Sequence, residues 1–267
     1  MSSTVTRRRS PLAHGLSPLD GPPDVPFGRT LHAELRKLVD TRAGLWMLIA
    51  IMSSTVLFMA PTVMNLPLSD LRFVDLTVMA TMPQMLLLPV IGILAATGEW
   101  SQRTGLVTFV LEPRRGRVVL AKLLAALALG LASFAAAVAT GAAANAAGIV
   151  LRHGDGSWAL DWVMLGSFSL MQVLLVAQGV GFGLVLQSTP AAIAAYYLLP
   201  TVWSVAASAV VWLQTAPAWL DMTQAVAPLL SDGMTSGAWV DLGISSTLWV
   251  VVPLLVGSWR VSRREIA

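Results

Sequence analysis

The stretch from Trp162 to Gln187 reads WVMLGSFSLMQVLLVAQGVGFGLVLQ and contains no Asp, Glu, Lys or Arg. At 1.5 Å per residue, a helix of this length exceeds the roughly 30 Å of hydrocarbon in a bilayer. Similar apolar runs recur along most of the chain after Leu45. Of the 267 residues, 56% are hydrophobic and only 12% are charged, about half the charged fraction usual in soluble domains. The composition therefore indicates a polytopic membrane protein.

Run length and charge content predict an all-α membrane protein with six transmembrane helices. The expected spans are residues 45–63, 74–97, 118–150, 162–187, 191–213 and 240–259. Pro83, Pro89, Pro200 and Pro253 lie inside these runs. Because neighbouring helices can satisfy the carbonyl groups that proline frees, we expect kinked helices at these positions rather than broken ones.

The sequence before the first span divides into two segments. Residues 1–28 are rich in Pro, Gly and Ser and lack an apolar core, which predicts a disordered cytoplasmic tail. In residues 29–43, leucines recur at helical spacing while charged residues fill the rest of the circumference, which predicts an amphipathic helix in the membrane interface. Residues 44–267 then form the six-helix transmembrane domain.

Basic residues predict the orientation. With the amino terminus in the cytoplasm, only Arg72 and Arg152 of the seventeen Lys and Arg residues fall on the outer side. Cytoplasmic connections of membrane proteins carry an excess of Lys and Arg. We therefore expect a multi-pass protein of a bacterial inner membrane, with both termini in the cytoplasm.

Several classes of function are disfavoured by what the sequence lacks. It has no cysteine and three histidines, none within an apolar run, so we expect neither a metal site nor catalytic residues. No predicted span has an ionisable residue near its centre, which disfavours an ion-coupled pump. No GxxxxGK[ST] motif occurs, so an energy source would have to lie on another chain.

The segment between the second and third spans carries the most motif-like sequence. It reads GEWSQRTGL over 98–106, LEPRRGR over 111–117 and AK at 121–122. This pattern resembles the type-two permeases of ATP-binding-cassette exporters, which have an acidic residue leaving span two, a Thr-Gly-Leu element, a Pro-Arg element and an Ala-Lys pair opening span three. The matching residues are Glu99, Thr104, Leu106, Pro113, Arg115, Ala121 and Lys122. The stretch AELRKL over 33–38 resembles the elbow helix of that family.

The resemblance implies that this segment forms a cytoplasmic coupling helix that docks into an ATPase subunit. The coupling residues would be Glu99, Arg103, Thr104, Leu106 and Phe109. Glu99 and Arg103 are spaced i, i+4 and can pair, while Leu106 and Phe109 supply an apolar surface. The alternative is a loop that only shields these residues against the membrane.

The last outer connection, over residues 214–241, has no Lys or Arg but is unusually apolar. It resembles the extracellular re-entrant segments of the same family, which close the exit path. Trp219, Leu229 and Leu230 would then form an outer gate. A helix resting on the outer leaflet explains the same composition.

A polar stripe in span two is a candidate substrate path. Thr77, Thr81 and Gln84 fall on one helix face beside Met82 and Met85. Flexible methionines suit varied apolar ligands. Interhelical hydrogen bonding and gap filling account for the same residues.

The sequence thus leads to one expected function and an alternative. The expected function is the permease subunit of an exporter of drugs, lipids, polysaccharides or antibiotics, pairing with a second identical or homologous copy and with two ATPase subunits. The chain would catalyse no chemical step and bind no cofactor or nucleic acid, and ATP and Mg would be held by the partner. A non-ABC membrane transporter or a membrane-embedded enzyme is the alternative.

Overall fold

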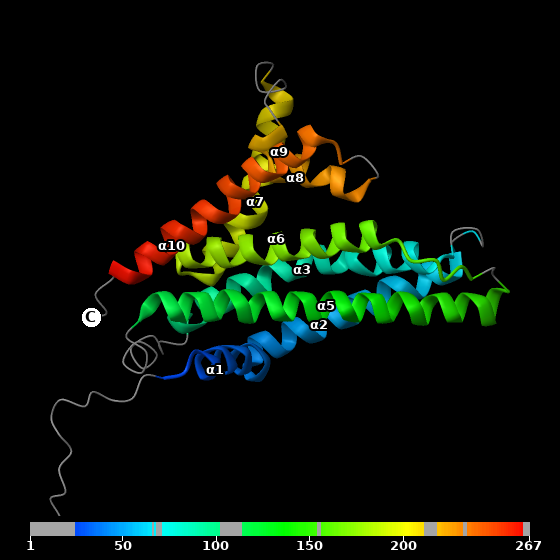
Figure 1. Ribbon diagram of the computed structural model, residues 1–267, viewed down its shortest axis with the longest axis horizontal. Helices are drawn as coiled ribbons and strands as arrows, with labels where there is room; N and C mark the ends of the chain where they lie inside the picture. The colour runs from blue at the N-terminus through cyan, green and yellow to red at the C-terminus, as the bar shows by residue number, and fades with distance from the viewer. Residues whose placement is uncertain are drawn as a thin grey trace, which may run out of the picture.

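The computed structural model describes residues 25–65, 67, 71–101, 114–153, 156–210, 218–231 and 234–263. Every secondary-structure element within these ranges is helical, as the apolar runs predict (Figure 1). The first 24 residues, which we predicted to be disordered, lie outside the described residues.

Six helical stretches are long and apolar enough to cross a membrane, so by length and composition the chain is a multi-pass α-helical membrane protein. The prediction of six spans is confirmed. They are α2 (Arg42–Asn65), α3 (Phe73–Ser101), α5 (Arg115–Arg152), α6 (Trp162–Leu186), α7 (Thr189–Ala209), and a continuous stretch of α9 (Ser236–Ser246), the π-helical turn η5 (Thr247–Val251) and α10 (Val252–Arg263). The helix of the fifth span, α7, ends at Ala209, before the predicted boundary at residue 213.

A separate helix, α1 (Phe27–Asp40), precedes the first span. Thr41 has an extended backbone and separates α1 from α2, so the boundary lies two to three residues earlier than predicted. Leu38 is buried, and Leu31 and Leu35 pack against the same core. Glu34 is also buried, although the helical pattern placed it on the polar face. It lies there because α1 packs along α5 and turns Glu34 toward the protein.

The centre of the fold is formed by α3, α5 and α6, which run side by side along the long axis (Figure 1). Glycines allow α3 and α6 to approach closely. A Cβ atom on Gly179 would lie 2.2 Å from the Pro89 carbonyl oxygen, and one on Gly92 would lie 2.3 Å from that of Val176. Small residues commonly allow membrane helices to approach in this way.

The prolines do not interrupt the spans. Pro83 and Pro89 lie inside α3 and Pro200 lies inside α7, and both helices continue through them as predicted. Pro253 follows the π-helical turn η5, in which the Val252 amide donates to the Thr247 carbonyl. A wider turn of this kind accommodates a residue that cannot donate its own hydrogen bond.

Helices α6 and α7 meet at a tight corner. Only Gln187 and Ser188 separate them, and Gln187 takes the left-handed conformation (φ 53°) while its amide donates to the Gly183 carbonyl. Pro190 occupies the first turn of α7, where a missing amide hydrogen costs nothing. From this corner α7 diverges from α6 toward the side where α8 and α9 lie (Figure 1).

The connection before the last span folds back against α6. It contains η3 (Ala218–Leu220), α8 (Met222–Val226) and η4 (Ala227–Leu230). Met222, Val226 and Leu229 are buried in one cluster with Met171 and Ala177, which belong to the middle turns of α6.

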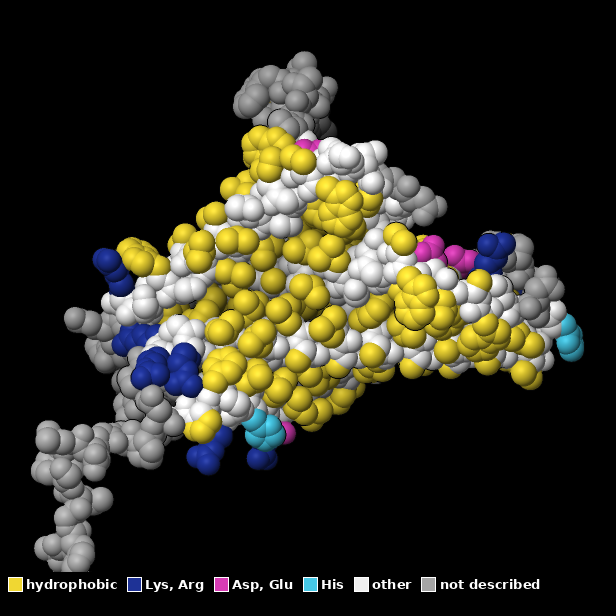
Figure 2. Space-filling view, viewed as in Figure 1, with side chains coloured by type: hydrophobic (Ala, Val, Ile, Leu, Met, Phe, Trp, Pro, Cys, Tyr) yellow, Lys and Arg dark blue, Asp and Glu magenta, His cyan; other side chains and the backbone are white. Residues whose placement is uncertain are grey.

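Charged and apolar side chains occupy different parts of the surface. Figure 2 shows hydrophobic side chains over the middle of the visible face, with most Lys and Arg at the end where α1 and the end of α10 lie. Large apolar side chains are widely exposed, including Leu57 (75%) and Val163 (81%). This distribution suits a protein surrounded by lipid.

Candidate functional site

Four charged residues form a ring where α1, α3 and α5 meet, and we call them the charged cluster: Glu34, Lys37, Glu99 and Lys122. Lys122 Nζ lies 2.8 Å from Glu34 Oε2 and 3.2 Å from Glu99 Oε1. Lys37 Nζ lies 2.6 Å from Glu34 Oε1 and 3.0 Å from Glu99 Oε1. Each acid therefore contacts both bases.

The charged cluster is buried except at Lys37. Glu34, Glu99 and Lys122 are at most 4% exposed. Buried charges of this kind are tolerated only when their partners are in place. Burial lowers the pKa of Lys37, but its hydrogen bond to Glu34 and the charges of Glu34 and Glu99 outweigh that effect and raise the pKa above its ordinary value. Lys37 is therefore a cation at neutral pH.

Among the predicted coupling residues, Glu99 is the one that the structure describes. It ends α3 inside the charged cluster, with Lys37 and Lys122 as partners in the described part of the chain. Arg103, its expected partner, lies outside the described residues, as do Thr104, Leu106 and Phe109. The motif did find Lys122, but it gave no sign that Glu34 and Lys37 complete the group.

The predicted polar stripe lies inside the protein. Thr77, Thr81 and Gln84 are at most 1% exposed. Gln84 Nε2 lies 3.4 Å from Thr55 Oγ1 of α2, and Gln172 Nε2 of α6 lies 3.0 Å from Gln84 Oε1. Gln84 thus joins three helices, which favours the interhelical alternative, whereas Thr81 Oγ1 donates to the Val78 carbonyl of its own helix.

The two methionines of the candidate path do not join the stripe. Met82 is 42% exposed on the surface of α3, whereas Met85 is partly buried against the cluster that contains Met171 and Met222. The structure therefore does not bring the five predicted path residues together.

The three predicted gate residues lie on the fold-back connection. Trp219 is half-buried in η3, and Leu229 is 3% exposed in the cluster against α6. Leu230 is 39% exposed and points away from that cluster. Only Leu229 is therefore packed where it could close a path.

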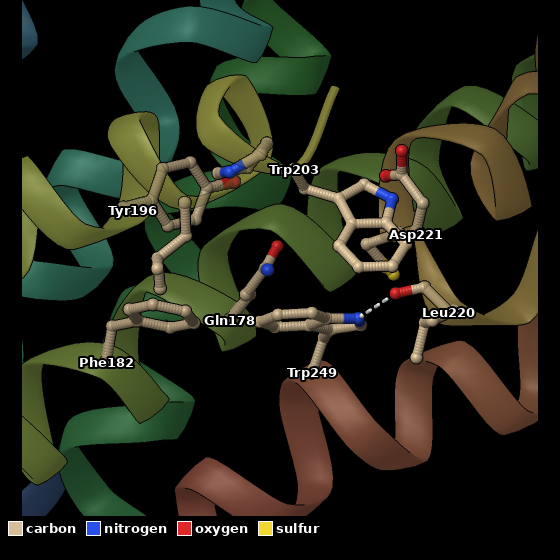
Figure 3. A pocket seen from close by; sticks show the side chains of 10 residues that line it. Gln178, Phe182, Tyr196, Trp203, Leu220, Asp221 and Trp249 are labelled. Carbon is tan, nitrogen blue, oxygen red and sulfur yellow. Dashed lines mark hydrogen bonds between the residues drawn. The ribbon is translucent and has the colours of Figure 1, made fainter. Parts of the chain in front are cut away.

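A second polar group lies in a pocket between α6, α7, η3, α8 and η5. The space between its lining atoms is about 330 Å³, which includes the open mouth and is not an enclosed cavity. Figure 3 shows aromatic side chains around an amide and a carboxylate. We call this space the aromatic pocket. It is lined by Gln178, Phe182, Tyr196, Leu199, Pro200, Trp203, Leu220, Asp221, Met222 and Trp249.

Local contacts hold the pocket walls. Trp249 Nε1 donates to the Leu220 carbonyl at 2.9 Å, the bond drawn in Figure 3. Asp221 caps the start of α8, where its Oδ1 accepts from the Thr223 amide at 2.8 Å. Phe182 and Tyr196 meet edge to face with centroids 5.8 Å apart.

Sequence reasoning missed this pocket. Asp221 was expected in an outer loop, and Gln178 had no assigned role. The available signal was an Asp at a helix start within an apolar connection, but only the fold-back against α6 brings it beside Gln178.

Within the described residues, no group of three or more His, Asp or Glu side chains could hold a metal ion. No family model matches the sequence, and no curated protein or solved structure matches the chain. The functional conclusion therefore depends on the geometry and chemistry of the charged cluster and the aromatic pocket.

Proposed function

We propose that the chain is the permease subunit of a type-two ATP-binding-cassette exporter in a bacterial inner membrane, with both termini in the cytoplasm. It forms the path for the substrate, pairs with a second permease copy and is driven by two ATPase subunits that hold ATP and Mg. The chain itself performs no chemical step.

The observation that carries this proposal is the charged cluster. Glu99 lies in the last turn of α3, which ends at Ser101 where the segment resembling a coupling helix continues, and Lys122 lies in the second turn of α5, the next described helix. The ion pairs of Glu99 join both ends of that segment to each other and to α1. A force applied to the segment by an ATPase would therefore reach three helices at once, as energy coupling requires.

The elbow role of α1 has support from its packing. Its leucines contact the core while Arg36 and Asp40 remain exposed on the other face. The extended residue Thr41 then turns the chain into α2. An amphipathic helix with these properties suits the cytoplasmic interface.

The position at which the outer connection packs along α6 supports the proposal that this connection is a re-entrant segment. Leu229 packs with Met171 and Ala177, which lie in the middle turns of α6 rather than at its first turn. A helix resting on the leaflet surface would contact only the end of α6. The proposed gate would therefore work through Leu229 rather than Leu230.

The least buried span, α7, and the two that follow it, α2 and the last span, offer faces for lipid or for the second copy. On α7, Leu198, Val202 and Val205 are each at least 59% exposed. One of these faces would meet the partner permease.

The test is reconstitution of the chain with its ATPase in lipid vesicles. We would measure complex recovery, basal ATPase rate and substrate-stimulated ATPase rate for the wild type, Leu106→Asp and Glu99→Gln. Leu106→Asp places a charge in an apolar docking groove and should abolish stimulation. Glu99→Gln weakens the link between the segment and α1 and should reduce stimulation while complex recovery is kept.

Arg36→Gln is the matched control, because its ion pair with Asp40 is exposed on the outer face of α1. It should leave all three measurements unchanged. Normal stimulation in Leu106→Asp, or failure of any ATPase to assemble with the chain, would exclude the exporter function and favour the non-ABC alternative.

A further inference from the structure

The aromatic pocket has the composition of a ligand site. Phe182 and Tyr196 stand on one side, and Trp203 and Trp249 stand on the other (Figure 3). Trp249 is carried by the π-helical turn η5, and such turns often occur at functional sites. The walls come from five separate helical elements, so the pocket exists only in the assembled fold.

Gln178 is a polar group without a partner inside this pocket. It is 6% exposed, and its amide points between the two aromatic walls (Figure 3). None of the described residues forms a hydrogen bond with its side chain. By contrast, Gln84 and Gln172 bond to each other at 3.0 Å in the same bundle.

Asp221 adds a negative charge that has no counterion in the described part of the chain. Its Oδ1 accepts from the Thr223 amide, and no Lys or Arg lines the pocket. Asp221 lines the same pocket as Gln178 and Phe182 of α6, and the connection that carries it packs on the middle turns of α6 through Met222 and Leu229, so this carboxylate lies beside spanning helices. An ionised group in such surroundings calls for a cation.

Aromatic faces and a carboxylate together select a particular ligand chemistry. Trp is the best aromatic side chain for cation–π attraction, and aromatic cages bind quaternary ammonium groups in this way. The carboxylate adds a direct charge interaction, while the apolar walls exclude strongly hydrated inorganic ions. A neutral apolar ligand would leave the negative charge of Asp221 without a positive charge to balance it.

We propose that the aromatic pocket binds a hydrophobic organic cation, namely a quaternary or protonated amine that carries an apolar group. Its charge lies between Asp221 and the faces of Trp203 and Trp249, its apolar group lies toward Phe182 and Tyr196, and the Gln178 amide meets its polar atoms. That this cation is the exported substrate rests on the function proposed above. Binding alone needs no ATPase, so the two proposals can fail separately.

The test is calorimetric titration of the full chain in nanodiscs of phosphatidylethanolamine and phosphatidylglycerol. The probe is phenyltrimethylammonium, with tert-butylbenzene, its uncharged isostere, as competitor. We expect saturable binding that Asp221→Asn weakens about tenfold and Trp203→Leu weakens about fivefold, which are ordinary losses for a charge pair and a cation–π contact. The isostere should change the apparent Kd less than about twofold, because it lacks the charge.

Asn still caps a helix, so Asp221→Asn should keep the fold of α8. The matched control is Asp241→Asn, which removes an equal charge from α9 outside the pocket lining and should leave the Kd unchanged. Absence of saturable binding, equal competition by the isostere, or equal weakening by Asp241→Asn would each overturn the proposal.

A phosphatidylcholine headgroup carries the same quaternary ammonium as a free organic cation. Repeating the titration in phosphatidylcholine nanodiscs separates these sources. An apparent Kd that rises in those nanodiscs assigns the pocket to a lipid headgroup, and an unchanged Kd assigns it to a free cation. Either assignment requires the loss of affinity in Asp221→Asn.

Discussion

The charged cluster and the aromatic pocket are both polar regions inside an apolar bundle, yet they differ in how their polar groups are satisfied. In the charged cluster each acid contacts two bases within 3.2 Å. In the aromatic pocket Gln178 has no hydrogen-bond partner and Asp221 no counterion among the described residues. Polar groups that have partners hold helices together. Polar groups without partners raise the free energy of the folded protein, and a ligand that supplies the partner can lower it again. Stability measurements on matched variants can therefore tell the two regions apart.

The largest loss of stability is expected for Lys122→Met. Removing this cation takes from the buried carboxylates of Glu34 and Glu99 a partner that lies within 3.2 Å of each. Breaking a buried pair in this way costs about 3–5 kcal/mol. Thermal unfolding of the purified chain in nanodiscs measures the loss.

The double variant Glu34→Gln with Lys122→Met serves as the control for Lys122→Met. It removes one charge of each sign and should recover part of the loss. A Lys122→Met protein as stable as the wild type would mean that the charged cluster does not hold α1, α3 and α5 together.

A smaller loss is expected for Gln84→Leu. This change removes the bond to Thr55 and leaves the Gln172 amide without its acceptor. Interhelical hydrogen bonds in membranes contribute about 0.6–1.7 kcal/mol. We would measure the unfolding midpoint together with export selectivity. A change in selectivity with unaltered stability would instead restore the stripe as a substrate path.

The third prediction concerns alkaline pH. Because the pKa of Lys37 is raised in the folded protein, its contribution is fully present below the unfolded pKa of about 10.4 and is lost as pH rises through the folded value. Lys37 is partly exposed, so we expect less than about 1 kcal/mol. Unfolding midpoints of wild type and Lys37→Met should differ at pH 8, and the difference should shrink as pH rises above the unfolded pKa of about 10.4. A difference that does not shrink with rising pH would refute a charge effect.

The smallest loss is expected for Gln178→Leu. Leucine removes an amide that has no partner in the described structure, so stability without ligand should stay equal or rise by about 1 kcal/mol. Gln84→Leu is the direct comparison, because it makes the same chemical change where the amide is bonded. Equal destabilisation of both proteins would show that Gln178 is satisfied after all, and the contrast between the two regions would be lost.

The spans and the helix before them were predictable because each leaves a local signal. Apolar runs of at least twenty residues set the six spans, and leucines at helical spacing set α1. The prolines in α3 and α7 were also placed correctly, since a bundle supplies the partners that proline removes.

The two polar regions were less predictable because they depend on how distant segments meet. Glu34 looks like a solvated charge until α1 is packed along α5, where Lys122 meets it at 2.8 Å. Asp221 looks like a loop residue until the connection folds back on the middle of α6 through Met222 and Leu229. A hydropathy average over this segment identifies it only as a connection between two spans. No local sequence pattern shows how far along α6 the segment folds back.

The two-residue corner between α6 and α7 has a consequence for biosynthesis. Gln187 and Ser188 are too few to form a loop that could wait outside the bilayer, so the two segments must enter the membrane together as a helical hairpin. Neither helix nor the corner carries a Lys or Arg. A hairpin without such charges has no topogenic signal of its own. Its orientation across the membrane must therefore follow from the basic residues of neighbouring helices, at the start of α5 and the end of α10. Moving arginines across those two flanks would therefore reorient a pair of helices that contains none.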